Sequence, residues 1–200
     1  MERILKNTPD MRKITFDIET EGDFRTNGDF SNLEITVLGV HDSLDNTLKG
    51  FYKDELKDAW SLFEAADIII GYNSEHFDIP ILNKYYAGDL TKIKSVDLLK
   101  EVKNVLGRRL KLDNLAEATL GRGKTADGLE AVEWWKKGLR EKVRDYCLAD
   151  VAITLELYEY AKKHGSVKYR DYDGVREIKL DTSAWEKTGD STSLTHTLPF

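Results

Sequence analysis

The regular pattern of the chain begins at residues 13–19, where apolar and polar side chains alternate strictly as Lys-Ile-Thr-Phe-Asp-Ile-Glu. Alternation with a period of two is typical of a half-buried β-strand, because successive side chains point to opposite faces. We therefore predict a strand with Ile14, Phe16 and Ile18 facing the core. Asp17 and Glu19 then share the opposite face, close enough to bind the same cation.

The rest of the pattern predicts an α/β layer fold with a mixed central sheet. Residues 67–71 contain a short apolar run, Ile68-Ile69-Ile70, which is typical of a buried strand parallel to the first. The remaining predictions are an antiparallel strand pair (33–40 and 47–52), helices over 54–66 and from Asp78, a short strand or link over 93–99, helices over 110–120, 132–137 and 141–163, and a hairpin around Asp173 and Gly174.

The composition is that of a single globular domain. The chain has 200 residues, 40% of them hydrophobic and 33% charged. No apolar run approaches the ~20 residues needed to span a membrane. The first residues lack the apolar stretch of a signal peptide, and the single cysteine, Cys147, cannot form an internal disulfide. We therefore expect a cytoplasmic protein with no membrane association.

The charge is unevenly distributed along the chain. The net charge is −6, yet the segment from Lys92 to Arg144 has a balance of +6 and the remainder one of −12. This distribution suits a surface that tracks phosphates beside a carboxylate metal site, although helices with solvated Lys and Glu faces would also produce it. Asp97, inside the segment, has two interpretations: a further carboxylate at the cleft mouth, or a helix cap.

Acidic residues at three places are candidates for chemistry. Asp17 and Glu19 repel each other on one strand face, and such oxygen pairs bind Mg²⁺ or Mn²⁺, although a solvated strand edge would also explain them. Asp78 follows a central strand at a helix start, where it could bind a ligand or merely cap the helix. Tyr146 and Asp150 share one helical face, where a buried carboxylate is costly unless it meets a cation.

Three motifs in this order resemble the DEDD superfamily of 3′–5′ exonucleases, in its tyrosine-bearing branch. They read Phe-Asp-Ile-Glu-Thr at 16–20, Gly-Tyr-Asn at 71–73 with Phe-Asp-Ile-Pro at 77–80, and Tyr-x-x-x-Asp at 146–150. A histidine-bearing relative would carry histidine where this chain has Asp145. The likeness is to the proofreading domain of family B DNA polymerases and to free-standing relatives, and it covers roughly residues 14–158. It implies a ribonuclease H-like fold, with a mixed central sheet flanked by helices.

The resemblance also implies a site for two divalent ions, Mg²⁺ or Mn²⁺, which such enzymes hold about 3.5–4 Å apart. In this likeness Asp17 bridges the ions, and Glu19 and Asp150 complete the site that activates water. Asp78 holds the second ion through water. Tyr146 orients the attacking water, since an unperturbed pKa near 10 makes tyrosine a poor base.

A further group of residues is expected to bind the substrate. Asn73 and Phe77 resemble family positions that contact the terminal nucleotide by a hydrogen bond and by packing against a base. Thr20, the last residue of the first motif, is assigned to substrate binding with them. Arg122 and Lys124 lie on the loop over 121–128 and are expected to contact phosphates.

The resemblance therefore predicts a metal-dependent 3′–5′ exonuclease acting on single-stranded DNA ends by a two-metal mechanism. An enzyme that trims RNA 3′ ends is the alternative, and an inactive nucleic-acid-binding module is disfavoured because all four acidic positions and the tyrosine are present. The expected partners are DNA 3′ ends, with RNA possible, and a DNA polymerase or another replication or repair protein. We expect one domain over 1–200, with a core over about 12–165 and a C-terminal extension over 166–200.

Overall fold

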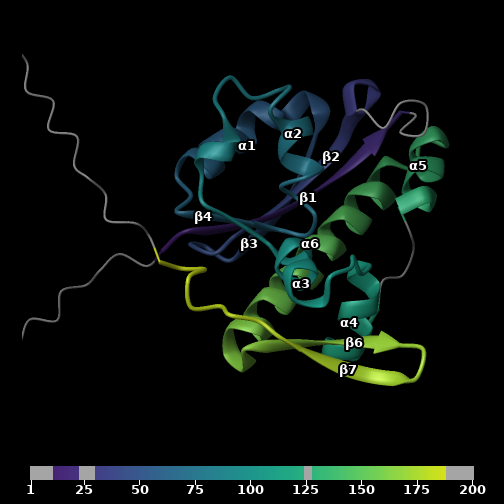
Figure 1. The fold of residues 1–200 in the computed structure, drawn as a ribbon. Coiled ribbons are helices and arrows are strands. Elements are labelled where there is room, and N and C mark those ends of the chain that lie inside the picture. Colours follow the sequence, from purple (N-terminus) through teal and green to yellow (C-terminus); the bar gives the residue numbers. More distant parts are fainter. Residues whose placement is uncertain (1–10, 23–29, 124–127, 188–200) are drawn as a thin grey trace, which may run out of the picture.

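The computed structural model describes residues 11–22, 30–123 and 128–187. Its centre is a five-stranded sheet with the order β3-β2-β1-β4-β5 (Figure 1). β2 is antiparallel to β1 and β3, whereas β4 is parallel to β1 and β5 is parallel to β4. The predicted α/β fold with a mixed sheet is confirmed. The strands of this sheet are β1 (Lys13–Glu21), β2 (Glu34–Asp42), β3 (Thr47–Tyr52), β4 (Ile68–Gly71) and β5 (Ser95–Asp97).

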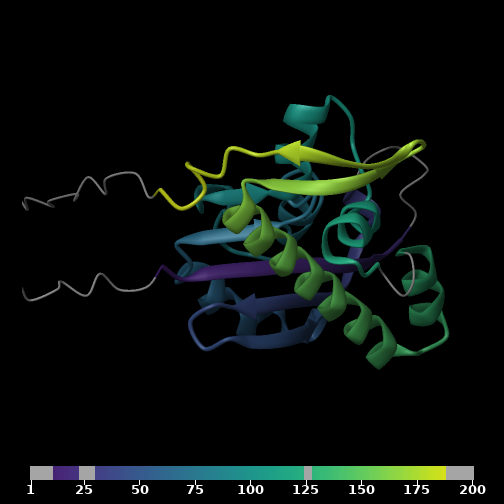
Figure 2. The ribbon, with the colours of Figure 1, turned by 90° about the horizontal axis from the view of Figure 1, so that it is seen from below.

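Helices cover both faces of the sheet. Figure 2 shows α6 lying diagonally across one face, and α1 and α2 pack on the other through their apolar residues. The helices are α1 (Leu56–Glu64), α2 (Asp78–Leu82), α3 (Leu98–Leu106), α4 (Leu112–Leu120), α5 (Gly128–Lys136) and α6 (Arg140–His164). No helix within the described ranges has both the length and the apolar run required to cross a membrane.

The predicted orientation of the first strand is confirmed. Ile14, Phe16 and Ile18 are at most 5% exposed and join the apolar cluster beneath α1 and α2. The ring of Phe16 lies edge-on to that of Phe63, with 5.4 Å between the ring centres. The alternate residues of β1, which include Asp17, therefore face α6.

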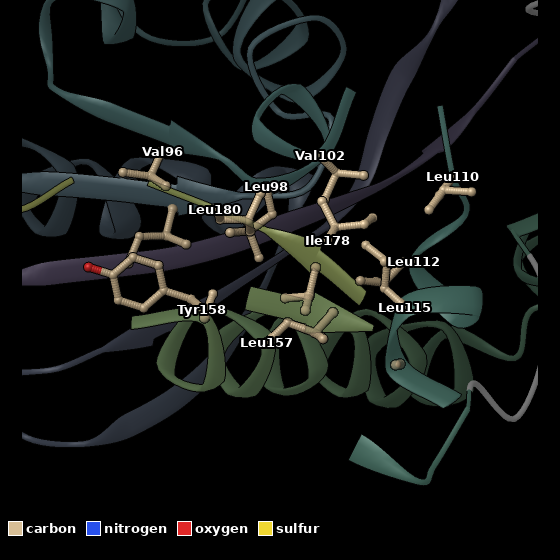
Figure 3. Packing of buried hydrophobic residues seen from close by; sticks show 14 of the residues in the cluster. Val96, Leu98, Val102, Leu110, Leu112, Leu115, Leu157, Tyr158, Ile178 and Leu180 are labelled. Carbon is tan, nitrogen blue, oxygen red and sulfur yellow. The ribbon is translucent and has the colours of Figure 1, made fainter. Parts of the chain in front are cut away.

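A hairpin beyond the long helix completes the second apolar cluster. β6 (Ser166–Asp171) and β7 (Gly174–Lys179) pair antiparallel, as the turn residues Asp173 and Gly174 predicted. Figure 3 shows side chains of α3, α4 and α6 converging with Ile178 and Leu180 of this C-terminal segment. Buried residues contributed from beyond α6 are Val167, Tyr169, Ile178, Leu180 and Trp185.

One helix was missed, because residues 93–99 were predicted to be extended and no helix was predicted between residues 99 and 110. The strand ends at Asp97, and α3 begins at the next residue without a loop. The Asp97 carboxylate caps the helix by accepting hydrogen bonds from the amides of Leu99 and Lys100, at 3.0 and 3.2 Å. Gly107, with φ of 77°, ends the helix in the left-handed conformation. Both capping signals are present in the sequence.

Glu186 connects the C-terminal segment to the first strand and the long helix. Burial raises the pKa of its carboxyl group, but hydrogen bonds from Lys162, Tyr158 and Lys13 outweigh burial and lower that pKa to about 2. The Tyr158 hydroxyl lies 2.8 Å from the carboxylate, and Lys13 Nζ lies 3.1 Å from it. Since the folded-state pKa is below the ordinary value of 4.5, this group stabilises the fold above about pH 4.5 and loses its effect as the pH falls toward 2.

Replacing Glu186 with glutamine is expected to lower the free energy of unfolding at pH 7 by about 1–2 kcal/mol, after allowance for solvent screening of a partly exposed carboxylate. Urea titrations at pH 7 and pH 3 measure the effect, which should shrink at the lower pH. Glu159→Gln is the matched control, because that carboxylate is 56% exposed and lies 3.8 Å from the same lysine. An equal loss in both variants would contradict the assignment.

Candidate metal centre and active site

Three of the predicted carboxylates meet where α6 crosses β1. Asp17, Glu19 and Asp150 each offer an oxygen, and these oxygens lie within 4.8 Å of one another. Glu19 and Asp150 are 9% and 4% exposed, and Asp17 is half-buried. Asp17 and Glu19 share one face of β1, whereas Asp150 comes from α6, which packs on that face.

A bulge in the neighbouring strand lies directly beside this cluster. Glu19 pairs with Val37, but the next residue, Thr20, pairs with Ile35, so Thr36 is an extra residue in β2. Bulges increase the local twist and redirect side chains, and they are frequent next to active sites. The irregularity therefore lies directly after the carboxylates of β1, at the step from Glu19 to the half-buried Thr20.

A glycine in β2 allows α6 to approach the sheet closely enough to complete the cluster. Gly39 pairs with Asp17 across the strands. A Cβ atom on Gly39 would lie 2.9 Å from Val151 Cγ2 and 3.0 Å from Cys147 Sγ, both on α6. These contacts are shorter than packed side chains tolerate. The motif comparison did not identify Gly39, and its only sequence signal is a small residue inside an apolar strand.

Asp78, the fourth predicted carboxylate, lies beside the cluster but is not part of the group within 4.8 Å. It is the first residue of α2, is 3% exposed, and its Oδ1 accepts a hydrogen bond from the amide of Ile18 at 3.1 Å. This amide lies on β1 between Asp17 and Glu19. Burial raises the pKa of Asp78 to about 8, although the bond from Ile18 opposes the shift.

Tyr146 lies one helical turn before Asp150 on α6. Its side chain is 5% exposed and packs with residues of α5 and β2. Its ring is edge-on to that of Trp134, with 5.9 Å between the centres. Trp134 and Trp135 of α5 are themselves half-buried against the apolar cluster that contains Tyr146. The tryptophan pair therefore contributes to packing around Tyr146.

The buried thiol of Cys147 lies against the carboxylate cluster. Its Sγ is 3.4 Å from the carbonyl oxygen of Asp17 and 3.8 Å from the Asp17 carboxylate. Burial, followed by the charges of Asp17, Glu19 and Asp150, raises the pKa of this thiol well above its ordinary value. The thiol therefore stays protonated and can donate toward Asp17.

A surface groove of about 470 Å³, which we call the inner groove, opens onto the cluster. On the wall of the groove formed by residues 109–113, the segment after α3 is joined to the motif at 71–73 by two hydrogen bonds. The Tyr72 hydroxyl donates to the carbonyl of Leu110 at 2.8 Å, and Arg109 Nη2 donates to Asn73 Oδ1 at 2.5 Å. The residues of this groove with polar side chains are Asp17, Tyr72, Asn73, Arg109, Lys111, Asp113 and Asp150.

Asp97 positions Asn73, so its capping interpretation is correct but incomplete. Besides capping α3, its carboxylate accepts hydrogen bonds from the amides of Asn73 and Glu75, at 2.8 and 3.1 Å. Asn73 has φ of 66°, a conformation that asparagine tolerates better than most residues. Asp97 therefore supports a strained turn at the wall of the groove, and it is 4% exposed.

The other predicted substrate residues lie in different surroundings. Phe77 precedes α2 and packs edge-on against Phe30, with 5.2 Å between the ring centres. Arg122 is paired with Glu156 of α6. Lys124 lies outside the described residues. Contact of any of these residues with a nucleotide stays a prediction.

The residues of the cluster fit divalent metal ions. Three carboxylates this close repel one another, and two of them are largely buried, so a bound cation would relieve the repulsion. Carboxylate oxygens are the ligands that hard cations such as Mg²⁺ and Mn²⁺ prefer. The site is therefore compatible with divalent metal binding.

Comparisons with known proteins agree with the fold. The structure is similar to a family B DNA polymerase from the hyperthermophilic archaeon Pyrobaculum calidifontis, with a TM-score of 0.59 and 23% identity over 77% of this chain and 25% of the polymerase. It is also similar to RNase D of Trypanosoma brucei, with a TM-score of 0.53 and 18% identity over 76% of this chain and 57% of that protein. The chain thus spans about a quarter and just over half of these two proteins.

The sequence itself was compared with individual proteins and with families. No curated protein matches it significantly. The family model described as RNase H superfamily matches residues 14–162, which contain all of β1 but its first residue, both later motifs and most of α6. The chain therefore belongs to the RNase H superfamily.

Proposed function

We propose that this protein is a metal-dependent 3′–5′ exonuclease that hydrolyses phosphodiester bonds at the ends of single-stranded DNA. The observation that carries the proposal is the convergence of Asp17, Glu19 and Asp150 within 4.8 Å, beside the inner groove. The order and spacing of the three motifs support the exonuclease class. The likeness to a family B DNA polymerase supports DNA as substrate and a polymerase or repair protein as partner.

The protein groups have distinct parts in this reaction. Asp17, Glu19 and Asp150 would hold the metal ions, with Asp78 as an outer ligand. When bound, such ions neutralise charge on the attacking and leaving oxygens of a phosphodiester. The Tyr146 hydroxyl orients the attacking water, which needs only a correctly placed hydrogen bond.

RNA is the second candidate substrate, and the likeness to RNase D favours it. The metal ions that the carboxylate cluster would hold act on the phosphodiester group, which DNA and RNA share, so this part of the site does not select between sugars. The sugars of the two substrates differ in the 2′-hydroxyl, which must be recognised by groups outside the cluster.

Digestion of end-labelled single-stranded oligonucleotides tests the proposal. Parallel reactions contain DNA or RNA, labelled at either end, with Mg²⁺, Mn²⁺ or EDTA. We expect 5′-labelled DNA to give a ladder of products that shorten progressively from the 3′ end, and EDTA to stop the reaction. Absence of hydrolysis with either metal would contradict the enzyme assignment, whereas a preference for RNA would select the second candidate.

Tyr146→Phe is expected to lower kcat by roughly 10- to 10³-fold while leaving metal affinity nearly unchanged, since it removes one water-orienting hydrogen bond. Single-turnover digestion measures the rate, and calorimetric titration with Mn²⁺ measures the affinity. Tyr160→Phe on the same helix is the matched control. Full activity of Tyr146→Phe would contradict the assigned role.

A further inference from the structure

We propose that a second, basic groove beside the metal centre binds the phosphates of the single strand beyond the nucleotide being released. This outer groove has a volume of about 400 Å³. The inference rests on the proposed nuclease function, and it predicts that longer strands are bound better than short ones. The polar residues of the outer groove used below are Asn73, Glu75, Asp97, Lys100, Lys103 and Arg109.

The two grooves are continuous. Asn73, Leu99 and Arg109 line both of them. The inner groove contains Asp17 and Asp150, so a nucleic-acid strand that leaves the carboxylate cluster can pass over Arg109 into the outer groove. The path is built by α3 and by the segment that joins α3 to α4 (Figure 1).

Cations without an ion-pair partner mark this path. Among the described residues, Lys111 of the inner groove, Lys103 of the outer groove and Arg109, which lines both, have no carboxylate within ion-pair distance. Arg109 donates to the neutral side chain of Asn73, so its charge is not compensated and its other N–H donors can bind a phosphate. Three uncompensated cations along one path would bind a polyanion such as a nucleic-acid strand through its phosphates.

The acidic side chains of the outer groove are already engaged. Glu75 is paired with Lys100. Asp97 is buried and accepts four backbone hydrogen bonds, from the amides of residues 73, 75, 99 and 100. Those bonds disperse its charge, so the groove as a whole presents its unpaired lysine and arginine groups to a ligand.

The neighbouring arginine provides an internal contrast. Arg108 is paired with Asp171 at 3.4 Å, and its guanidinium lies 5.5 Å from the centre of the Tyr169 ring. It therefore packs toward the hairpin and lines neither groove as described. Removing Arg108 changes the net charge as much as removing Arg109 does, but it leaves the proposed path intact.

The test measures how strand length and salt affect substrate use by Lys103→Ala/Arg109→Ala and by the control Arg108→Ala. Oligothymidylates of 2, 4, 8 and 12 nucleotides are digested with Mg²⁺, and their binding is measured by fluorescence anisotropy in EDTA. We expect the KM of the wild type to fall with length, and that of the double variant to be about tenfold higher for the 12-mer and nearly independent of length. The slope of log K against log salt should decrease by about 1.4, since each phosphate contact on a single strand contributes about 0.7.

Each outcome has a defined meaning. Wild-type length and salt dependence in the double variant, with an unchanged melting temperature, would overturn the inference, as would an equal effect in Arg108→Ala. If the double variant has a lower melting temperature, Lys103→Glu replaces it in the test. This substitution changes one exposed side chain and should likewise reduce the dependence of KM on strand length. If the wild type fails to hydrolyse even the p-nitrophenyl ester of thymidine 5′-phosphate, the proposed function fails, while the anisotropy data still decide the path.

Discussion

Replacing Asp17 with asparagine is expected to reduce phosphodiester hydrolysis by at least about 10³-fold while the fold is retained. The carboxylate lies within 4.8 Å of the oxygens of Glu19 and Asp150, and asparagine removes the charge that holds a divalent ion there. A loss of this size corresponds to about 4 kcal/mol of transition-state stabilisation. The oligonucleotide digestion described above measures it.

The same variant should melt at a higher temperature than the wild type in EDTA, because one of three repelling charges is removed. Mg²⁺ or Mn²⁺ should reverse the order by stabilising the wild type, by about 2.7 kcal/mol at a hundred times Kd. Asp58→Asn, an exposed position on α1, is the control. If Asp17→Asn melts lower in EDTA and still digests DNA, then Asp17 is structural and the metal-site interpretation is wrong.

The second large effect is expected from Gly39→Ala. The added methyl group would lie 2.9 Å from Val151 Cγ2 and 3.0 Å from Cys147 Sγ, so α6 must move away from the sheet. Such overpacking costs about 1–3 kcal/mol of stability. Since Asp150 is carried by the same helix, the movement should also weaken metal binding, which titration with Mn²⁺ measures alongside thermal unfolding.

Gly50→Ala is the matched control for that substitution. Gly50 pairs with Gly39 on the adjacent strand, but an added Cβ would meet Cγ and Cδ of Arg144, a long side chain that can change rotamer. We expect a smaller loss of stability and little change in metal affinity. If Gly39→Ala is as mild as the control, then close approach of α6 is not what assembles the cluster.

Local patterning was sufficient to predict most of the fold. The alternation in residues 13–19 identified the strand and its two faces, and the apolar run before Gly71 identified a parallel strand. The helix at Leu98–Leu106 was missed because it begins at the residue after β5, where Asp97 is both the last strand residue and the cap. Because no loop separates β5 from α3, the strand pattern with a period of two runs directly into the helical pattern with a period of about 3.6, and no run of polar loop residues marks the boundary.

The candidate site was harder to predict from the sequence. Chemically distinctive residues such as Asp17 and Asp150 could be identified from motifs, and the structure brings these two together with Glu19. Gly39 and Arg109 could not, since their roles depend on which segments the fold places opposite them. A glycine in a strand and an arginine in a loop have no distinctive local pattern, and the contact that gives each its role spans many residues of sequence.

The hairpin after α6 has a consequence for how the protein is delimited. The superfamily match ends at residue 162, but Ile178, Leu180 and Trp185 are buried against side chains of α3, α4 and α6. Ending the protein at residue 162 would therefore expose apolar surface on α3, α4 and α6, the helices that line the inner groove. The segment that matches the superfamily, residues 14–162, is shorter than the segment that packs into the core, which extends to Trp185. Any excised version of this protein therefore has to include the hairpin and the residues after it.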